Sequence, residues 1–239
     1  MPELVDKVAL ITGAGSGIGQ SIAIALAKAS VRILIVGRNA APLDALAAQV
    51  NAARGHAHVF TADLTQAEGR DAVAAWAIEE FGGVDLFVHS AGAIKAGCAD
   101  LSDEDVDRMF QINVIAAHGL TARLLPSLVE RKGQIVYINS RAGFMNVPKY
   151  AAYCATKWAL KAYADGLRET VRAQGVRVIS VYPGKVDTPL LQTLFSETGS
   201  PYLGHKYARP EDIANATMEA LMVARHVEIP DVVVRPFDD

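Results

Sequence analysis

Tyr153 and Lys157 are the pair of side chains in this 239-residue sequence whose types and spacing most directly suggest chemistry. They stand four positions apart within a helical pattern, so they share one face of the helix. A free tyrosine has a pKa of about 10, which is too high for it to act readily as a base at neutral pH. A nearby ammonium group stabilises tyrosinate and lowers that pKa. The pair is therefore suited to proton transfer, although the spacing alone also fits two ordinary surface residues.

Two further polar residues could work with this pair. Ser140 precedes Tyr153 by thirteen residues at the end of a predicted strand, and Asn113 lies in the segment QINVIAAHG. A serine hydroxyl in that place could hydrogen-bond a carbonyl oxygen and hold it for transfer. Tyr150 lies one turn before Tyr153, but its i+4 residue is Cys154 and not lysine. Tyr153 is therefore the candidate proton donor.

A glycine-rich stretch near the N-terminus, TGAGSGIG over residues 12–19, lies between the apolar runs KVALI and IAIALA. A strand, a glycine turn and a helix in this order place backbone N–H groups and a helix N-terminus against a phosphate. Glycines let the backbone turn sharply and approach a pyrophosphate closely. The spacing differs from G-x-G-x-x-G, the common dinucleotide fingerprint. Alone, it also fits a tight turn between strand and helix that binds no ligand.

The spacing T-G-x-x-x-G-x-G resembles that of the short-chain dehydrogenase/reductase family, and the likeness extends from Lys7 to at least Thr188. That family uses an asparagine, a serine, a tyrosine and a lysine together, and this chain has all four, at Asn113, Ser140, Tyr153 and Lys157. The resemblance implies that NAD or NADP binds at the glycine turn. It also implies that Tyr153 is the general acid in reduction and the base in oxidation, and that Lys157 binds the nicotinamide ribose. Asn113 would link Lys157 to solvent through a water molecule.

The resemblance places cofactor contacts in six parts of the chain: Gly13, Gly15, Ser16, Gly17, Ile18 and Gly19; Arg38; Asp63 and Leu64; Ser90, Ala91 and Gly92; Tyr153 and Lys157; and Pro183, Gly184, Val186 and Thr188. Gly37 stands where NAD-dependent members usually have aspartate, and the next residue, Arg38, could pair with a 2′-phosphate. NADP(H) is therefore favoured, with NAD(H) possible if Arg38 is only a solvated loop residue. The segment HSAG, residues 89–92, departs from the family's N-N-A-G, and we assign His89 to the scaffold on the cofactor side and not to proton transfer.

The substrate is less well marked. The candidate substrate contacts are Phe144, Tyr150, Leu190 and Leu191, which would give the pocket an apolar wall. The C-terminal sequence HVEIPDVVVRPFDD looks like the branch that contains NADP-dependent 3-hydroxy acid and serine dehydrogenases and related carbonyl reductases. We therefore expect hydride transfer between NADP(H) and a ketone or secondary alcohol. The alternatives are an NAD-dependent alcohol dehydrogenase, a 3-oxoacyl-thioester reductase and a non-catalytic redox sensor that binds a dinucleotide.

Short β-branched runs alternate with longer helical patterns along the whole chain. The predicted strands are nearly all apolar, as expected for strands covered on both faces: Val8–Ile11, Arg32–Val36, Ala57–Thr61, Leu86–His89, Gln134–Asn139, Val176–Tyr182 and Val232–Arg235. The predicted helices are Gly17–Ala29, Pro42–Ala53, Gln66–Phe81, Asp103–Glu130 (read as two helices, the first capped by Ser102), Tyr150–Ala173 and Pro210–Ala224. This alternation predicts an α/β fold: a single Rossmann domain over residues 1–239, with a doubly wound, seven-stranded parallel sheet and helices on both faces. The least regular stretch, LLQTLFSETGSPYLGH, falls in a predicted substrate loop at about residues 189–207.

Composition argues against several other classes of protein. The net charge of −3 provides no electrostatic reason to expect a nucleic acid or an anionic membrane as partner. The charged N-terminus MPELVDKV is unlike a signal peptide, and no apolar run is expected to reach membrane-spanning length, so we expect a cytoplasmic protein. Cys98 and Cys154 lack metal-ligand spacing and are expected to be buried free thiols, and the chemistry needs no metal. The expected partners are a small carbonyl or alcohol substrate and further copies of the chain, in a tetramer or dimer.

Overall fold

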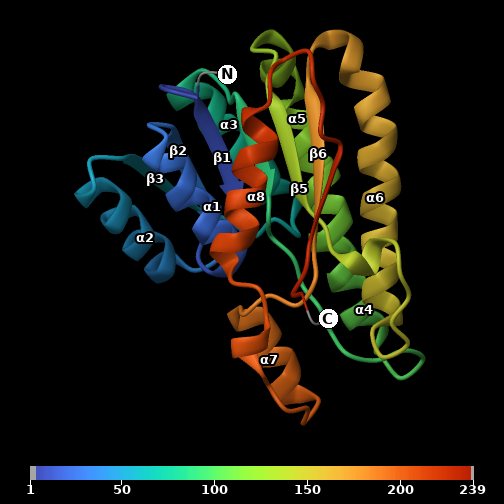
Figure 1. Ribbon diagram of the computed structural model, residues 1–239. Helices are drawn as coiled ribbons and strands as arrows, with labels where there is room; N and C mark the ends of the chain where they lie inside the picture. The colour runs from blue at the N-terminus through green and yellow to red at the C-terminus, as the bar shows by residue number, and fades with distance from the viewer. Residues whose placement is uncertain (1–3, 238–239) are drawn as a thin grey trace.

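The computed structural model describes residues 4–237. Seven parallel strands form one sheet in the order β3-β2-β1-β4-β5-β6-β7 (Figure 1). Their bounds are Val8–Thr12 (β1), Arg32–Gly37 (β2), His56–Thr61 (β3), Leu86–His89 (β4), Gln134–Ile138 (β5), Arg177–Pro183 (β6) and Asp231–Val234 (β7). The reversal of strand order between β1 and β4 makes the sheet doubly wound, which confirms the predicted fold class.

Helices cover both faces of this sheet (Figure 1). One face is covered by α1 (Gly17–Lys28), α2 (Ala40–Ala52) and α8 (Pro210–Met222), and the other by α3 (Ala67–Phe81), α5 (Ala116–Glu130) and α6 (Ala151–Val171). Each central strand therefore sends alternate side chains into two apolar clusters. In β1, Ala9 and Ile11 join the cluster on the α1 side, and Val8 and Leu10 join the cluster on the α3 side. Burial on both faces explains why the central strands are unbroken apolar runs in the sequence.

The segment predicted as two helices is one continuous helix with a π-helical turn in its middle. It runs from α4 (Asp103–Phe110) through the turn Gln111–Ile115 into α5, and the residues at both junctions keep helical backbone angles. Ser102 begins it as predicted, since its hydroxyl accepts a hydrogen bond from Asp105 N at 3.1 Å. By length and composition this helix could cross a membrane, contrary to the expectation that no run is long enough. Half of its most apolar window is buried within the domain, as in the core helix of a globular fold.

The predicted substrate loop contains a helix. It is α7 (Pro189–Glu197), which in Figure 1 projects beyond the carboxyl edge of the sheet. The hydroxyl of Thr188 caps its N-terminus by accepting from Leu191 N at 3.3 Å. The signal in the sequence is the Thr-Pro pair, a capping residue followed by one whose fixed φ suits the first helical position.

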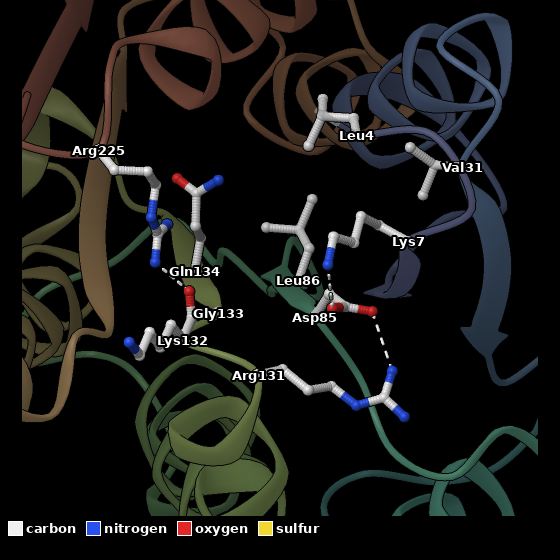
Figure 2. Close-up of a pocket in the computed structure, with 10 residues that line it drawn as sticks. All are labelled: Leu4, Lys7, Val31, Asp85, Leu86, Arg131, Lys132, Gly133, Gln134 and Arg225. Atoms are coloured by element: carbon white, nitrogen blue, oxygen red, sulfur yellow. Dashed lines mark hydrogen bonds and ion pairs between the residues drawn. The ribbon is translucent and has the colours of Figure 1, made fainter. Parts of the chain in front are cut away.

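A buried carboxylate ties the starts of three strands together at the amino edge of the sheet. Asp85 precedes β4 and accepts hydrogen bonds from Val8 N at 3.0 Å, Lys7 Nζ at 3.1 Å and the Arg131 guanidinium at 3.0 Å. Figure 2 shows Asp85 between Lys7 and Arg131 on the wall of a cavity of about 210 Å³. Burial alone would raise the pKa of Asp85, but these hydrogen bonds outweigh it and lower the pKa. The cavity lies at the opposite edge from the carboxyl ends of the strands, where ligands bind in sheets of this kind.

Asp85→Ala should lower the free energy of unfolding by about 2–4 kcal/mol, because Val8 N–H and two cations lose a buried partner. Denaturant unfolding at pH 7 measures the change. Asp71→Ala is the matched control, because its ion pair with Arg123 is exposed and its loss should leave the unfolding midpoint nearly unchanged. Equal destabilisation of the two variants would contradict the role assigned to Asp85.

Candidate active site

The face of α6 that meets the sheet holds the predicted proton-transfer pair. Lys157 is buried, and its Nζ donates to the carbonyl of Ile138, the last residue of β5, at 3.0 Å. The same nitrogen lies 5.8 Å from the centre of the Tyr153 ring. The helical spacing puts both side chains on one face, and the end of β5 fixes the position of the ammonium group.

Ser140 follows β5, and its hydroxyl lies near enough to Tyr153 to affect the pKa of that residue. Its Oγ accepts from Ala142 N at 3.2 Å, and its own N–H donates to the side-chain oxygen of Asn139 at 2.9 Å. Asn139 is a residue that the sequence reasoning missed. It is buried, and its Nδ2 donates to the Lys157 carbonyl at 3.3 Å. One amide side chain therefore holds Ser140 against the helix that carries Tyr153 and Lys157.

Burial dominates the electrostatics of this pair. It raises the pKa of Tyr153 to about 12, and the nearby Ser140 hydroxyl lowers this pKa by less than burial raises it. Burial also lowers the pKa of Lys157 to about 8. We expected the Lys157 ammonium to lower the pKa of Tyr153, but without a bound cofactor this pKa is raised. The reason is that burial disfavours both the tyrosinate and the ammonium form. At neutral pH Tyr153 keeps its proton and Lys157 keeps most of its charge.

Asn113 lies in the π-helical turn and is completely buried. Its Oδ1 accepts from Ala93 N and its Nδ2 donates to the Ala93 carbonyl, both at 2.9 Å. Its Nδ2 also donates to Thr156 Oγ1 at 2.9 Å, and that hydroxyl donates to the Tyr153 carbonyl at 2.7 Å. The side chain of Asn113 thus clamps the loop after β4 to α6. Neither Ala93 nor Thr156 was predicted as a site residue, since a backbone group and a small hydroxyl leave no distinctive pattern in a sequence.

The glycine turn packs against the end of β4. Gly13 has a φ of +66°, and a Cβ there would lie 2.7 Å from Ala91 N. A Cβ on Gly19 would lie 2.5 Å from the Gly13 carbonyl oxygen, so only glycine fits at either position. The first N–H groups of α1 have no partner within the helix and stand at this side-chain-free cradle. The turn therefore has the shape and the hydrogen-bond donors that a pyrophosphate requires.

Further contacts bring other predicted cofactor segments next to the glycine turn and to Lys157. A Cβ on Gly17 would lie 3.1 Å from Thr188 Cγ2, so the segment after β6 borders the glycine turn. A Cβ on Gly92 would lie 3.1 Å from Asn113 Oδ1 and 4.0 Å from Lys157 Nζ, which places the loop after β4 beside the predicted proton-transfer pair. Pro183, the last residue of β6, and Val186 are buried, and Gly184 N donates to the Val234 carbonyl.

The residues predicted to meet the adenosine lie at the carboxyl ends of β2 and β3. Arg38 and Asp63 are exposed, and Leu64 is buried beneath them. Hydrogen bonds from the backbone and hydroxyl of Thr65 lower the pKa of Asp63, and the charges of Arg38 and Arg108 add to this. Arg38 and Asp63 thus lie close enough at these strand ends for the charge of Arg38 to lower the pKa of Asp63.

The four predicted substrate contacts lie on two elements near the crevice. Tyr150 immediately precedes α6, one turn before Tyr153, and the Phe144 ring packs on Tyr182 with 5.2 Å between ring centres. Leu190 and Leu191 form the first turn of α7 next to Thr188. Phe144 is 38% exposed and Leu190 is 49% exposed, so both have surface to offer a ligand.

Neither the cysteines nor the acidic residues form a metal centre in the part of the chain described. Among residues 4–237, no three His, Cys, Asp or Glu side chains are grouped closely enough to hold a metal ion. Cys154 is buried as expected, but Cys98 is exposed. Cys98 lies in a surface turn, where its backbone N–H donates to the Asp100 carboxylate.

Comparison with known proteins identifies the family. A family model described as short chain dehydrogenase matches residues 7–199. The chain belongs to the short-chain dehydrogenase/reductase family. An uncharacterized oxidoreductase of Staphylococcus aureus (strain MRSA252) is 33% identical to this short-chain dehydrogenase over 238 residues, which are 99% of this chain and 100% of that protein.

Two solved structures extend the comparison to three dimensions. An alcohol dehydrogenase from the archaeon Thermococcus sibiricus, complexed with 5-hydroxy-NADP, has a TM-score of 0.88 and 26% identity, covering 98% of this chain and 97% of that one. An L-sorbose reductase from Gluconobacter frateurii, complexed with NADPH and L-sorbose, has the same TM-score, identity and coverage. Together with the family match, these likenesses confirm the predicted family, and the branch within it stays a prediction.

This short-chain dehydrogenase has His89 where the family usually has asparagine. His89 is 1% exposed; its Nδ1 lies 3.1 Å from Thr12 Oγ1, and its Nε2 lies 3.2 Å from the Ile112 carbonyl oxygen. Burial, and then the charge of Lys157, lower its pKa from 6.5 to about 3. His89 is therefore neutral at physiological pH, in keeping with its assignment to the scaffold.

The depressed pKa of His89 makes the fold sensitive to acid. Above pH 6.5 the residue is neutral in both states and its contribution to stability is complete; as the pH falls towards 3 only the unfolded state gains the proton. Between pH 7 and pH 5 the wild-type protein should lose about 2 kcal/mol more unfolding free energy than His89→Asn, as measured by denaturant unfolding.

His56→Asn, which removes an exposed histidine from β3, controls for the loss of any histidine. Equal losses in the wild-type protein and in His89→Asn over this range would show that His89 is not held neutral by the fold.

Proposed function

We propose that this protein transfers a hydride between NADP(H) and a ketone or secondary alcohol, with Tyr153 as general acid and base. The observation that carries the proposal is the position of the Lys157 ammonium, 5.8 Å from the centre of the Tyr153 ring, with the Ser140 hydroxyl near enough to lower the Tyr153 pKa. This group borders the same crevice as the glycine turn, because Gly92 lies next to both Asn113 and Lys157. A proton donor, an oxygen-holding hydroxyl and a phosphate cradle thus meet at one place.

When bound, the cofactor supplies or accepts the hydride at its nicotinamide ring. The protein controls the substrate oxygen: Ser140 donates a hydrogen bond to it, and Tyr153 transfers a proton to it during reduction. A pKa of about 12 keeps Tyr153 protonated at neutral pH, which is the form that carbonyl reduction needs. In oxidation Tyr153 accepts the proton from the alcohol, and the Lys157 charge stabilises the tyrosinate that this requires.

Lys157 and Asn113 support the tyrosine. The ammonium group, held by the Ile138 carbonyl, is placed to bind the ribose hydroxyls next to the nicotinamide. Proton supply from solvent through Asn113 and a water would use the Asn113 backbone carbonyl, because its side chain is occupied by Ala93 and Thr156.

Arg38 is the residue that we propose binds the 2′-phosphate of NADP(H). It is exposed at the end of β2, directly after Gly37. A Cβ on Gly37 would lie 3.2 Å from Leu43 Cδ2, so an aspartate there would need Leu43 to move by a few tenths of an ångström. The Thermococcus and Gluconobacter structures were obtained with 5-hydroxy-NADP and NADPH, which supports NADP(H) for this chain. NAD(H) is the alternative.

We also propose that Phe144, Tyr150, Leu190 and Leu191 contact a small carbonyl or alcohol substrate, and that the protein is a cytoplasmic homo-oligomer. In support of an oligomer, Val233 on the edge strand β7 is 55% exposed and Trp158 on α6 is 44% exposed. A subunit interface over β7 and α6 would cover both side chains.

Tyr153→Phe should lower kcat/KM for carbonyl reduction by about 10³-fold, because the variant has no proton to transfer, and should leave the affinity for NADPH within about threefold. The loss of NADPH absorbance across a panel of ketones, 3-oxo acids and 3-oxoacyl thioesters measures turnover, and NADPH fluorescence measures binding. Tyr163→Phe removes a hydroxyl from the same helix and is the matched control.

The panel also separates the alternatives. A best substrate among the thioesters would favour the 3-oxoacyl reductase reading. Tight dinucleotide binding with no turnover of any compound by the wild-type protein would favour a redox sensor and contradict the proposal.

Arg38→Ala should weaken NADPH binding by about 10- to 100-fold and leave NADH binding unchanged, because a charge-assisted hydrogen bond to the phosphate is lost. Adding Gly37→Asp should then improve NADH binding through the ribose hydroxyls. Titration of each nucleotide by fluorescence measures both effects. Lys28→Ala, which removes a positive charge from the far end of α1, is the control. Equal weakening of both nucleotides by Arg38→Ala would refute the phosphate assignment.

A further inference from the structure

His89 lies at the centre of the site, yet the proposed chemistry assigns it no role. Its ring joins Thr12, where β1 enters the glycine turn, to Ile112, the residue before Asn113 in the π-helical turn. We propose that His89 is a positioning residue whose neutral ring, with its proton on Nε2, fixes the glycine turn and the π-helical turn relative to each other. This inference rests on the proposed function, since the alignment of the two turns affects turnover only if cofactor and Tyr153 react between them.

The Nε2 contact acts on the catalytic side. A π-helical turn shifts the hydrogen-bond pattern of a helix, so carbonyl groups around it need partners from outside. The Ile112 carbonyl can only accept, so the ring must donate from Nε2, which leaves Nδ1 as an acceptor. This bond holds the backbone next to Asn113, whose side chain reaches Thr156. A shift of Ile112 would therefore be transmitted to Tyr153, because Thr156 donates to the Tyr153 carbonyl.

The Nδ1 contact acts on the cofactor side. Thr12 Oγ1 accepts from Ser90 N at 3.2 Å and from Ala91 N at 3.1 Å, and its own proton points to Nδ1 of His89. His89 thereby sets the direction of the hydroxyl that joins β1 to the loop after β4. A protonated ring would present a second donor to Thr12, and burial beside the Lys157 charge prevents this by lowering the pKa of His89.

The two contacts can be separated by mutation, because an amide can imitate either ring nitrogen. Asparagine, which the family usually has here, places its amide near the position of Nδ1, so His89→Asn keeps the Thr12 contact and loses the Ile112 contact. Glutamine reaches the position of Nε2, so His89→Gln keeps the Ile112 contact and loses the Thr12 contact. Each of the two variants therefore removes one of the two hydrogen bonds and keeps a polar side chain at position 89.

His89→Asn should lower kcat about tenfold and leave the KM for NADPH within about threefold. His89→Gln should raise the KM for NADPH about tenfold and leave kcat within about threefold. His56→Asn, on the exposed edge of β3, is the control, and a thermal melt of each variant reports stability. If His89 only supported the fold, kcat and KM would worsen together with stability in both variants, and that result overturns the proposal.

Hydrogen exchange, which needs no turnover, distinguishes this inference from the proposed function. The amides of residues 111–115 should exchange about tenfold faster in His89→Asn than in the wild-type protein, and at the wild-type rate in His89→Gln. If the wild-type protein reduces no carbonyl with either cofactor, the proposed function fails, and the exchange rates still decide the role of His89. Unchanged exchange in His89→Asn overturns the positioning role whatever the activity.

Discussion

The backbone of the glycine turn, which follows β1, lies very close to the backbone of the loop that follows β4. A Cβ on Gly13 would lie only 2.7 Å from Ala91 N. No side chain fits there, and Thr12 closes the gap by accepting two amide hydrogen bonds from that loop. The loop continues to Ala93, which both donates to and accepts from Asn113, and Asn113 reaches α6 through Thr156. A continuous series of hydrogen bonds therefore links the close contact between these two backbones to the helix that carries Tyr153.

The same dense packing sets the protonation states. Loss of water raises the pKa of Tyr153 and lowers those of Lys157 and His89, so each group is pushed towards its neutral form. Lys157 keeps most of its charge near neutrality because its pKa falls only to about 8 and its Nζ donates to the Ile138 carbonyl. At neutral pH the group therefore contains a charged Lys157, a protonated Tyr153 and a neutral His89. This combination suits the donation of a proton to a carbonyl oxygen.

Much of this could be predicted from the sequence, because the features concerned are periodic or depend on one residue type. Apolar runs marked the strands, the four glycines marked the turn, and the i+4 spacing marked Tyr153 with Lys157. The π-helical turn at Gln111–Ile115 could not be predicted, because it departs from the helical period by a single residue and is contacted by groups distant in the sequence, such as His89 and Thr156. The rise in the Tyr153 pKa was missed for a related reason: a sequence shows which charges are near in the chain but not how much water is excluded.

The segment that we propose faces the substrate is held together differently. This segment runs from Thr188 to Ala208 and contains α7. A short parallel β-bridge between Val186 and Ala208 joins its two ends. Inside it, the Tyr202 hydroxyl donates to Asp187 at 2.5 Å, and the rings of Phe195, Tyr202 and Tyr207 pack on one another. These contacts join the segment to itself and to its base, and an exposed ion pair of 3.8 Å between Glu197 and Lys95 joins it to the loop after β4. Under the proposed function, the class of reaction is therefore encoded in positions that the sheet dictates, whereas the choice of substrate would depend on exposed side chains such as Leu190 that the sheet does not constrain.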